Sequence, residues 1–432
     1  MCSSTPASAP LPFSLLRIYT SVAVLLLGAI ALIVPSGYSV GAVLLLFGTF
    51  ALPFTRTNAR FGRQDWWVVG ALVFYALVGL FEAWSDGLGF RGVDKPLRFL
   101  LVIPVLALIL AFPPRLGWLW GGLALGGIAV GSWGAWQKLL SGVERAGGYT
   151  HVIQFGNISM LTGILCLAGM GWAMVQPHRK QWLLLLGLGA LGGVLGSLFS
   201  GSRGGWVGLP VVLWVLYRAY GRDLAAPFKV GALAIVVVGA LCVYAVPQLG
   251  VQQRVHQAVD DIERYVSGES RTSSVGARFE MWKGASHLII EKPLLGWGYN
   301  GYQQGMQSLA DAGVIDPGIL QFGHAHNEFI DATAKRGILG LIALLFLYLV
   351  PMRLFMRQLH SPNLELRSLA VAGALLPVAY IDFGLSQVFL AHNSGVMIYT
   401  FWLVVLWGSY QACQHRACQR QLYTKTKTAG FN

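Results

Sequence analysis

Long apolar segments recur along the whole chain and are separated by short polar connections. A transmembrane helix needs roughly 20 mostly apolar residues, and by that measure the pattern predicts about twelve such helices. The predicted segments are 14–34, 39–54, 66–84, 97–112, 116–136, 155–175, 181–199, 204–220, 228–247, 337–355, 368–389 and 394–411. We therefore expect an all-α polytopic membrane protein.

One connection is far longer than the others. Residues 248–336 separate the ninth and tenth predicted helices, and loops of such length are usually functional. Two stretches within it have helical apolar periodicity. These apolar positions are Val251, Val255, Val259, Ile262 and Val266 in the first, and Phe279, Trp282 and Ile289, with Ser286 on the same stripe, in the second. We expect a helical subdomain whose apolar faces pack on the membrane helices or on the lipid interface.

The distribution of lysine and arginine predicts the orientation, because cytoplasmic loops are enriched in both. With the N-terminus inside, the inner segments hold 17 basic residues and the short outer loops hold six. Both termini are then cytoplasmic, and the long loop lies outside. Residues 1–13 carry no basic residue ahead of the first apolar run, so we expect no cleavable signal peptide.

These predictions divide the chain into four parts. Residues 1–247 form the membrane domain with the first nine helices, and 248–336 form the outer helical loop, which carries part of the active site. Residues 337–411 contain the last three helices, and 412–432 form a basic cytoplasmic tail.

Composition agrees with a membrane protein and excludes other classes. The chain of 432 residues is 55% hydrophobic and only 11% charged, whereas soluble domains carry about 25% charged residues. Its 54 glycines lie within apolar runs and have no three-residue period, so the chain is not collagen-like. The net charge of +13 comes from the inner segments, which carry +14, while the rest carries −1. The positive charge therefore reflects topology and does not indicate a nucleic-acid partner.

Three outer segments contain candidate chemistry. The turn 200–206 places Arg203 among small residues at a helix start, where backbone amides can bind an anion, although a snorkelling arginine is the alternative. Arg278 begins the second amphipathic stretch, where a surface ion pair with Glu280 is the alternative. The glycine-rich turn 293–301 matches no dinucleotide fingerprint.

The segment 322–331 is the most informative, because two histidines, an amide and two carboxylates precede an apolar span. Histidine transfers protons near neutral pH. If His326 lies near a helix N-terminus, the helix dipole keeps its imidazole neutral and able to accept a proton.

Other interpretations of this segment stay open. His324, His326 and Asp331 could bind a metal, although their spacing is no recognised ligand motif. His326 and Asp331 also match the H-x4-D pattern of acyltransferases, and Asn327 with Glu328 could simply cap a helix.

A transporter is a further alternative for a chain with so many spans. Its ionisable groups would lie near the middle of the bilayer. Only Glu82 and Asp382 are clear acids within spans, and neither has a basic partner in its own span.

The motifs resemble those of the O-antigen ligase and polymerase superfamily, and the ligases most closely. The ligase signature has His, then Asn, Ser or Gln, nine residues, Gly, two residues, and Gly, Thr or Tyr. In this chain the signature residues are His326, Asn327, Gly337 and Gly340. Further upstream, Ser202-Arg203-Gly204 resembles the family's S-R-G turn. Arg278 with Trp282, followed by Leu295-Gly-Trp-Gly298, resembles its R-x3-W segment and glycine turn.

The resemblance implies a metal-independent glycosyltransferase of the bacterial inner membrane that uses no cofactor. It would transfer O-antigen polysaccharide from undecaprenyl diphosphate to a hydroxyl of lipid A–core on the periplasmic face. The catalytic residues would be Arg203, Arg278 and His326. The substrate-binding residues would be His324, Asn327, Arg98, Lys95, Gly296 and Gly298. O-antigen polymerases and protein O-oligosaccharyltransferases share the arginine and glycine motifs, so both remain alternatives.

Overall fold

The chain folds into a bundle of α-helices, and no strand occurs in the residues that the structure describes. The computed structural model describes residues 11–55, 61–202, 204–222, 225–246 and 251–429. Its α-helices are α1 (Leu11–Ala29), α2 (Gly37–Thr49), α3 (Arg63–Ser85), α4 (Gly89–Ala111), α5 (Leu116–Ala135), α6 (Val152–Ala168), α7 (Met170–Met174), α8 (Arg179–Ser200), α9 (Leu209–Leu216), α10 (Ala226–Ala245), α11 (Val251–Ser267), α12 (Gly276–Glu291), α13 (Gly298–Asp311), α14 (Glu328–Met356), α15 (Leu364–Gly384) and α16 (Asn393–Ala429).

The predicted membrane character is confirmed, although the number of twelve spans is not. Among the described residues, eight helices are long and apolar enough to cross a bilayer. They coincide with the predicted spans 39–54, 66–84, 116–136, 155–175, 181–199, 337–355, 368–389 and 394–411. The predicted spans 14–34 and 204–220 contain shorter apolar helices, Ser14–Ala29 and Leu209–Gly221. The remaining two predicted spans lie on α4 and α10.

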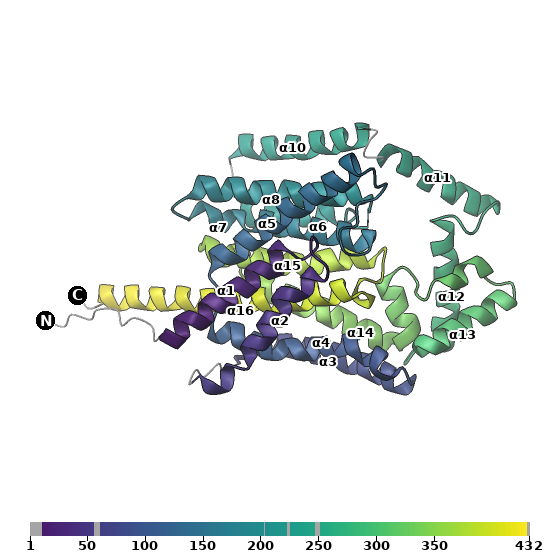
Figure 1. Cartoon of the computed structure of the whole chain (residues 1–432), viewed down its shortest axis with the longest axis horizontal. Helices are drawn as coiled ribbons and strands as arrows, with labels where there is room; N and C mark the ends of the chain where they lie inside the picture. Colours follow the sequence, from purple (N-terminus) through teal and green to yellow (C-terminus); the bar gives the residue numbers. More distant parts are fainter. Residues whose placement is uncertain (1–10, 56–60, 203, 223–224, 247–250, 430–432) are drawn as a thin grey trace.

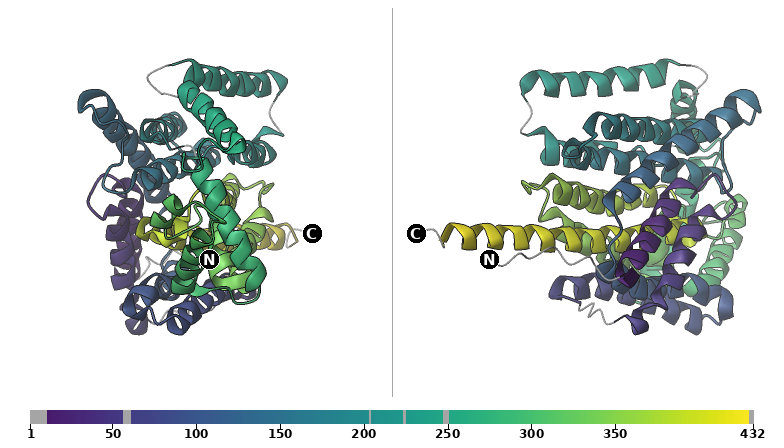
Figure 2. Two further views of the ribbon diagram at one scale, coloured as in Figure 1. Left: turned by 90° about the vertical axis from the view of Figure 1, so that its right-hand side faces the viewer. Right: turned by 60° about the vertical axis from the view of Figure 1, so that its left-hand side comes forward.

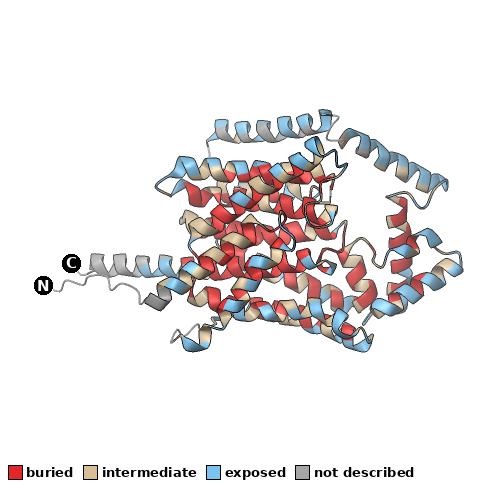
Figure 3. Ribbon diagram, in the orientation of Figure 1, coloured by how far each residue is buried: buried red, intermediate tan, exposed pale blue. Residues whose placement is uncertain are grey.

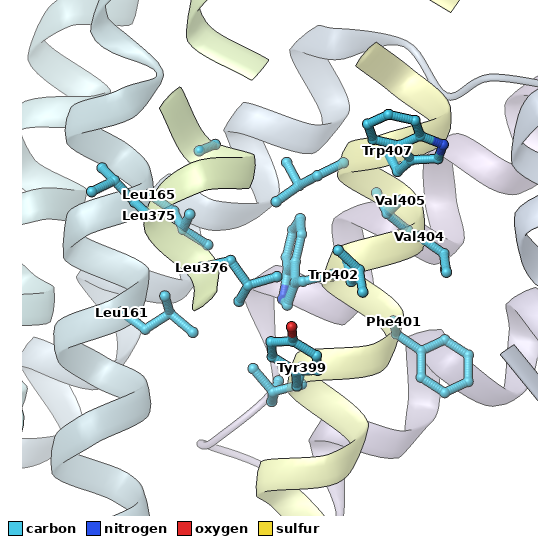
Figure 4. Packing of buried hydrophobic residues seen from close by; sticks show 14 of the residues in the cluster. Leu161, Leu165, Leu375, Leu376, Tyr399, Phe401, Trp402, Val404, Val405 and Trp407 are labelled. Atoms are coloured by element: carbon cyan, nitrogen blue, oxygen red, sulfur yellow. The ribbon is translucent and has the colours of Figure 1, made fainter. Parts of the chain in front are cut away.

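The core of the bundle is formed by apolar side chains from helices that are distant in sequence. Leu161 and Leu165 of α6 lie near Leu375 and Leu376 of α15, and Trp402 of α16 lies close to them (Figure 4). The buried residues of the whole molecule concentrate in this central part (Figure 3).

Glycine allows close contact between α5 and its neighbour α8. A Cβ added at Gly127 would lie 2.1 Å from the carbonyl oxygen of Gly189, and one at Gly192 would lie 2.2 Å from that of Gly127. Small residues permit such close backbone approach between membrane helices. The abundance of glycine in apolar runs thus has a packing cause, and this packing fixes the position of the turn that follows α8.

Helices α12 and α13 form a separate small unit at one end of the bundle, opposite the beginning of α1 and the end of α16 (Figures 1 and 2). Their core includes Met281, Leu288, Tyr302 and Met306. The predicted apolar stripe on the second amphipathic stretch is therefore displaced: Ser286 is exposed, and the buried face of α12 is centred on Met281, Ala285 and Leu288.

The first predicted amphipathic stretch is a helix, α11. However, Val255, Val259, Ile262 and Val266 are all exposed, so the expected packing of this stripe on the protein itself is not observed. Helix α10 and α11 extend along the outside of the bundle (Figures 1 and 3).

Helix α14 begins nine residues before the predicted span and bends at the predicted boundary. Gly337 has φ 62° and ψ −162°, outside the helical region. The amides of Ile338 and Leu339 bond to the carbonyl groups of Pro293 and Leu294, at 2.8 and 3.5 Å. The segment Glu328–Arg336 is thus a short helix before the bend, and the apolar span follows.

Candidate functional site

Segment 322–331 forms a tight loop that leads into α14. His326 adopts a left-handed backbone conformation with φ 48°, which is uncommon for a residue other than glycine. Asn327 caps the helix, because its Oδ1 accepts hydrogen bonds from the amides of Phe329 and Ile330 at 3.0 and 3.1 Å. The predicted cap is thus correct for Asn327, and the cap fixes His326 directly before the helix start.

Two other groups hold this loop from inside the protein. Asp331 accepts the amide of Ala325 at 3.0 Å and pairs with Lys335 at 2.9 Å. Lys335 also donates to the carbonyl of Gly323 at 2.8 Å. From α12, the indole of Trp282 donates to the carbonyl of Ala325 at 2.9 Å. The loop between the two histidines is therefore fastened to both α14 and α12.

These bonds bear on the alternative interpretations of Asp331. Both of its carboxylate oxygens bond to Lys335, and one also accepts the Ala325 amide. Asp331 therefore stabilises the conformation of the loop, and it makes no hydrogen bond to His326 among the described contacts. Within the described ranges, no group of three or more His, Cys, Asp or Glu side chains is arranged to hold a metal ion.

Glu328 connects the start of α14 to another part of the chain. It does not share the capping role that the sequence suggested. Its buried carboxylate accepts the amides of Phe389 and Leu390, at distances down to 2.7 Å for Phe389 and 3.1 Å for Leu390. The connection between α15 and α16 is thereby held against the histidine loop.

This connection contributes two polar residues that sequence reasoning missed, Gln387 and His392. The amide nitrogen of Gln387 lies 3.4 Å from Nε2 of His392, and the Gln387 side chain raises the pKa of His326 against the larger effect of burial. The ring of His392 stacks against that of His151, the N-cap of α6, with centroids 6.3 Å apart. His392 and His326 each lie just before the start of a long helix that contains an apolar span, and this shared position is the signal that could have found His392.

The histidines are held in their neutral form. The rings of His324 and His326 make edge contact, with centroids 4.2 Å apart. Burial, followed by the positive charges of His324 and Arg278, lowers the pKa of His326 to about 4. Burial, followed by the charges of His324 and His151, lowers the pKa of His392 to about 4. The expectation of a neutral His326 therefore agrees in direction, and burial is the main cause.

Arg278 lies on the first turn of α12, one turn before Trp282. It is half-buried, and burial lowers the pKa of its guanidinium. The surface pair with Glu280 that the sequence allowed does not form. Glu280 is buried and accepts the hydroxyl of Tyr265 at 2.8 Å and the amide of Asp316 at 2.7 Å. Arg278 makes no ion pair within the described part of the chain, so its charge is available to an anion near His326.

Arg203 lies outside the described residues, but its neighbours are described. The hydroxyl of Ser202 bonds to Oδ1 of Asn157 at 3.3 Å. A Cβ added at Gly204 would lie 2.0 Å from the hydroxyl oxygen of Ser386, next to Gln387. The turn after α8 therefore lies beside the segment in which the carbonyl of Leu385 accepts the side-chain amide of Asn327 at 3.3 Å. The motifs at 202–204 and 326–327, more than 120 residues apart in sequence, meet through this segment.

A cleft of about 730 Å³ opens on the other side of the histidine loop, between α3, α4, α14 and the connection before α16. Its polar lining includes Arg91, Lys95, His324, Lys335, Arg336 and His392. Of the two residues on α4 that were expected to bind substrate, Lys95 lines this cleft. Arg98 does not line it and pairs with Asp94 at 2.6 Å.

The glycine turn before α13 packs closely on α14. Gly296 and Gly298 have φ 72° and 69°. A Cβ at Gly296 would lie 2.4 Å from the carbonyl carbon of Lys335, and one at Gly298 would lie 2.8 Å from the carboxylate of Asp86. Both glycines line a smaller hollow of about 220 Å³. Their observed contacts are with protein backbone and Asp86, and a contact with substrate stays a prediction.

The two acids within spans have protein partners. Glu82 of α3 forms an ion pair with Arg336 of α14, and Asp382 accepts the amide of Gly208 at 2.7 Å. The absence of a basic partner in the same span was therefore misleading for Glu82, because the partner lies on another helix. Both carboxylates contribute to helix packing, which weakens the case for a transporter.

Comparisons with known proteins agree with the motifs that meet here. Residues 188–345 match a family model described as O-antigen ligase. The chain is 30% identical over 369 residues to an uncharacterized protein of Haemophilus influenzae, covering 85% of this chain and 92% of that protein. It is 31% identical over 100 residues to the O-antigen ligase of Escherichia coli, covering 23% of this chain and 24% of that protein. The matched family segment contains Arg278, His326 and the bend at Gly337.

Proposed function

Because the chain belongs to the O-antigen ligase superfamily, we propose that it transfers O-antigen polysaccharide from undecaprenyl diphosphate to a hydroxyl of lipid A–core. The reaction takes place on the periplasmic face of the bacterial inner membrane. One observation carries the proposal: Trp282, one turn after the unpaired, half-buried Arg278 on α12, donates a hydrogen bond of 2.9 Å to the carbonyl of Ala325, the residue before His326. The residue that we propose as the base and the arginine that we propose to bind the anion are thus on segments joined by a hydrogen bond.

The chemistry assigns one role to each group. The neutral imidazole of His326 accepts the proton of the acceptor hydroxyl as its oxygen attacks the anomeric carbon of the donor sugar. The bond between that carbon and the diphosphate oxygen breaks, and its electron pair leaves with the lipid diphosphate. Arg278 and Arg203 stabilise the charge that develops on the departing oxygen.

The remaining candidates have supporting roles in this proposal. His324 contacts the ring of His326 and lines the cleft, so it is placed to contact a substrate. Asn327 orients His326 by capping α14. Lys95 contacts a substrate phosphate, and Arg98 acts through its pairing with Asp94 on the same helix face.

The test is reconstitution of the purified protein with a lipid-linked polysaccharide and lipid A–core. The wild type is expected to form ligated lipopolysaccharide, and His326→Ala is expected to lose at least 1000-fold in rate while eluting as a folded protein. General acid–base catalysis contributes roughly 10²–10⁴-fold, so a loss below tenfold would refute the base role.

Arg278→Lys separates bidentate binding from simple charge. Lysine keeps the charge and loses the planar fork, so we expect at least a tenfold lower rate. Lys283→Gln on the same helix is the matched control, because its ammonium is exposed and bonds only to the carbonyl of Val314. Product formation with a pilin-like protein and none with lipid A–core would assign the chain to the protein-glycosylating branch.

A further inference from the structure

The cleft of about 730 Å³ contains two cations without an ion-pair partner among the described residues. Arg91 and Lys95 are four residues apart, so they lie on the same face of α4, and both line the cleft. Neither makes an ion pair or a side-chain hydrogen bond within the part of the chain that the structure describes. By contrast, Lys335 is paired with Asp331 and Arg336 with Glu82.

The cleft is amphipathic. Its apolar lining includes Tyr75, Phe99, Val388 and Leu390, and its two unpaired cations lie on the first two turns of α4. A molecule with an anionic headgroup and an apolar portion matches both parts. A neutral sugar polymer has no anionic group for the two cations.

Exposed aromatic side chains mark the level of these cations. Trp84 at the end of α3 is 78% exposed, and Phe90 directly before Arg91 is 96% exposed. Exposed tryptophan and other aromatic residues near helix ends are typical of the headgroup level of a bilayer. Arg91 and Lys95 therefore lie at the level at which phosphates of a membrane-embedded lipid are found.

The histidine loop separates this cleft from Arg278. His324 lines the cleft, whereas neither Arg278 nor His326 does. The loop is held on one side by Trp282 of α12 and on the other by Asp331 and Lys335 of α14. Because the transfer joins two lipid-linked molecules, it needs two binding sites that meet at the base.

We propose that this cleft is the acceptor site and that Arg91 and Lys95 bind a phosphate group of the acceptor glycolipid. This inference rests on the proposed function, which gives Arg278 and Arg203 to the donor diphosphate. The acceptor hydroxyl then approaches His326 past His324, from the opposite side of the loop to the donor.

The test compares Arg91→Gln/Lys95→Gln with the wild type, using lipid A–core before and after phosphatase treatment. We expect the KM for intact acceptor to rise at least tenfold in the double variant, with kcat and the donor KM unchanged. In the wild type, phosphatase treatment of the acceptor is expected to raise KM similarly. The double variant should no longer distinguish the two acceptors.

Two further variants test whether misfolding or a general loss of positive charge raises the acceptor KM. Arg91→Lys/Lys95→Arg keeps both charges and should retain a KM within threefold of the wild type, which shows that the fold tolerates changes here. Lys138→Gln/Lys283→Gln removes two positive charges outside the cleft and should leave KM unchanged.

The other outcomes overturn the inference. An unchanged acceptor KM in the double variant would mean that the two cations contact only bulk phospholipid, and a rise in donor KM instead would assign them to the donor diphosphate. Binding of lipid A–core to the protein in nanodiscs without donor keeps the two proposals distinguishable. If the wild type binds the acceptor in a phosphate-dependent way and the double variant does not, the cleft is supported as the acceptor site even if no transfer occurs. If the double variant transfers as efficiently as the wild type, the acceptor site in the cleft is refuted while the proposed transferase activity stands.

Discussion

The properties of His326 come from its surroundings more than from its place in the sequence. The sequence indicated a neutral imidazole through a helix N-terminus, and Asn327 does begin that helix. Burial is nevertheless the largest cause of the lowered pKa, followed by the charges of His324 and Arg278. Burial depends on packing between distant segments, so a local pattern could supply the direction of the shift but not its cause.

Gln387 and His392 could not be predicted for a related reason. They reach the histidine loop because Glu328 binds the amides of Phe389 and Leu390, 61 and 62 residues further along the chain. No spacing rule connects residues so far apart. The pairing of Asp331 with Lys335, four residues further along the same helix, follows a known spacing rule. Its bond to the Ala325 amide depends on the conformation of the loop, which the sequence does not specify.

The pH dependence of transfer should report the shifted pKa of His326. The neutral form is required, and protonation occurs only as the pH falls through about 4, whereas an ordinary histidine has a pKa of about 6.5. We expect kcat/KM for the acceptor to be retained from pH 7.5 down to 5.5. Gln387→Glu places a carboxylate beside the ring, raises its pKa and should lower activity at pH 5.5 severalfold.

The lowered pKa values of His326 and His392 also determine how the stability of the folded protein changes with pH. Between pH 6.5 and 4 the unfolded chain binds protons that folded His326 and His392 do not, so stability is fully present above about 6.5 and declines as the pH falls. Fluorescence-detected size exclusion at pH 5.5 therefore accompanies the assay, to show that folded protein is being measured. A wild-type profile with its midpoint near 6.5 would contradict the prediction.

At the scale of elements, periodicity identified helices well and their buried faces less well. It predicted the positions of α11 and α12, but the stripe on α12 was misplaced because small residues form the contact face: Ala277, Gly284 and Ala285 are buried. Hydropathy also placed the start of a span at residue 337, where α14 bends. The nine preceding helical residues are too polar to be recognised as part of the same helix.

Substitution of Gly337 should be costly. Its φ of 62° disfavours a side chain, and an added Cβ would lie 2.2 Å from the carbonyl oxygen of Leu294. A left-handed conformation alone costs roughly 1–2 kcal/mol for an L residue, so we expect Gly337→Ala to destabilise the protein by about 2 kcal/mol or more. The midpoint of thermal unfolding in detergent is the measurement.

Gly70→Ala is the matched control, because it lies within α3 and a Cβ there meets no atom within 4 Å. Alanine in a helix interior is favoured over glycine by about 1 kcal/mol, so this variant should unfold at the same temperature or slightly higher. Equal unfolding midpoints for the two variants would mean that the bend is not fixed by the backbone of residue 337.

At the scale of the whole molecule, hydropathy was sufficient to predict a helical membrane protein. Apolar length depends on the bilayer and not on tertiary packing, so the membrane class could be predicted without knowledge of contacts. The exact number of spans could not, because the first half of α4 contains Arg91, Asp94, Lys95 and Arg98. In the folded chain the histidine loop lies at the end opposite the beginning of α1 and the end of α16 (Figure 1).

The predicted orientation can be tested with single cysteines in a background from which all five native cysteines are removed. We expect a membrane-impermeant maleimide to label Lys283→Cys in intact spheroplasts and to leave Arg357→Cys unlabelled. Both side chains are exposed, so both should react after permeabilisation. Labelling of position 357 alone before permeabilisation would reverse the topology.

The bend at Gly337 also gives a physical meaning to the fixed interval between the histidine motif and the glycine. Glu328 to Arg336 is nine helical residues, which rise about 13.5 Å at 1.5 Å each. This interval sets the distance, along the helix axis, between His326 and the start of the apolar span. One inserted residue would lengthen this helical segment by only about 1.5 Å, but it would rotate Glu328 by about 100° about the helix axis, away from Phe389 and Leu390. The spacing is therefore constrained by rotation far more strictly than by length.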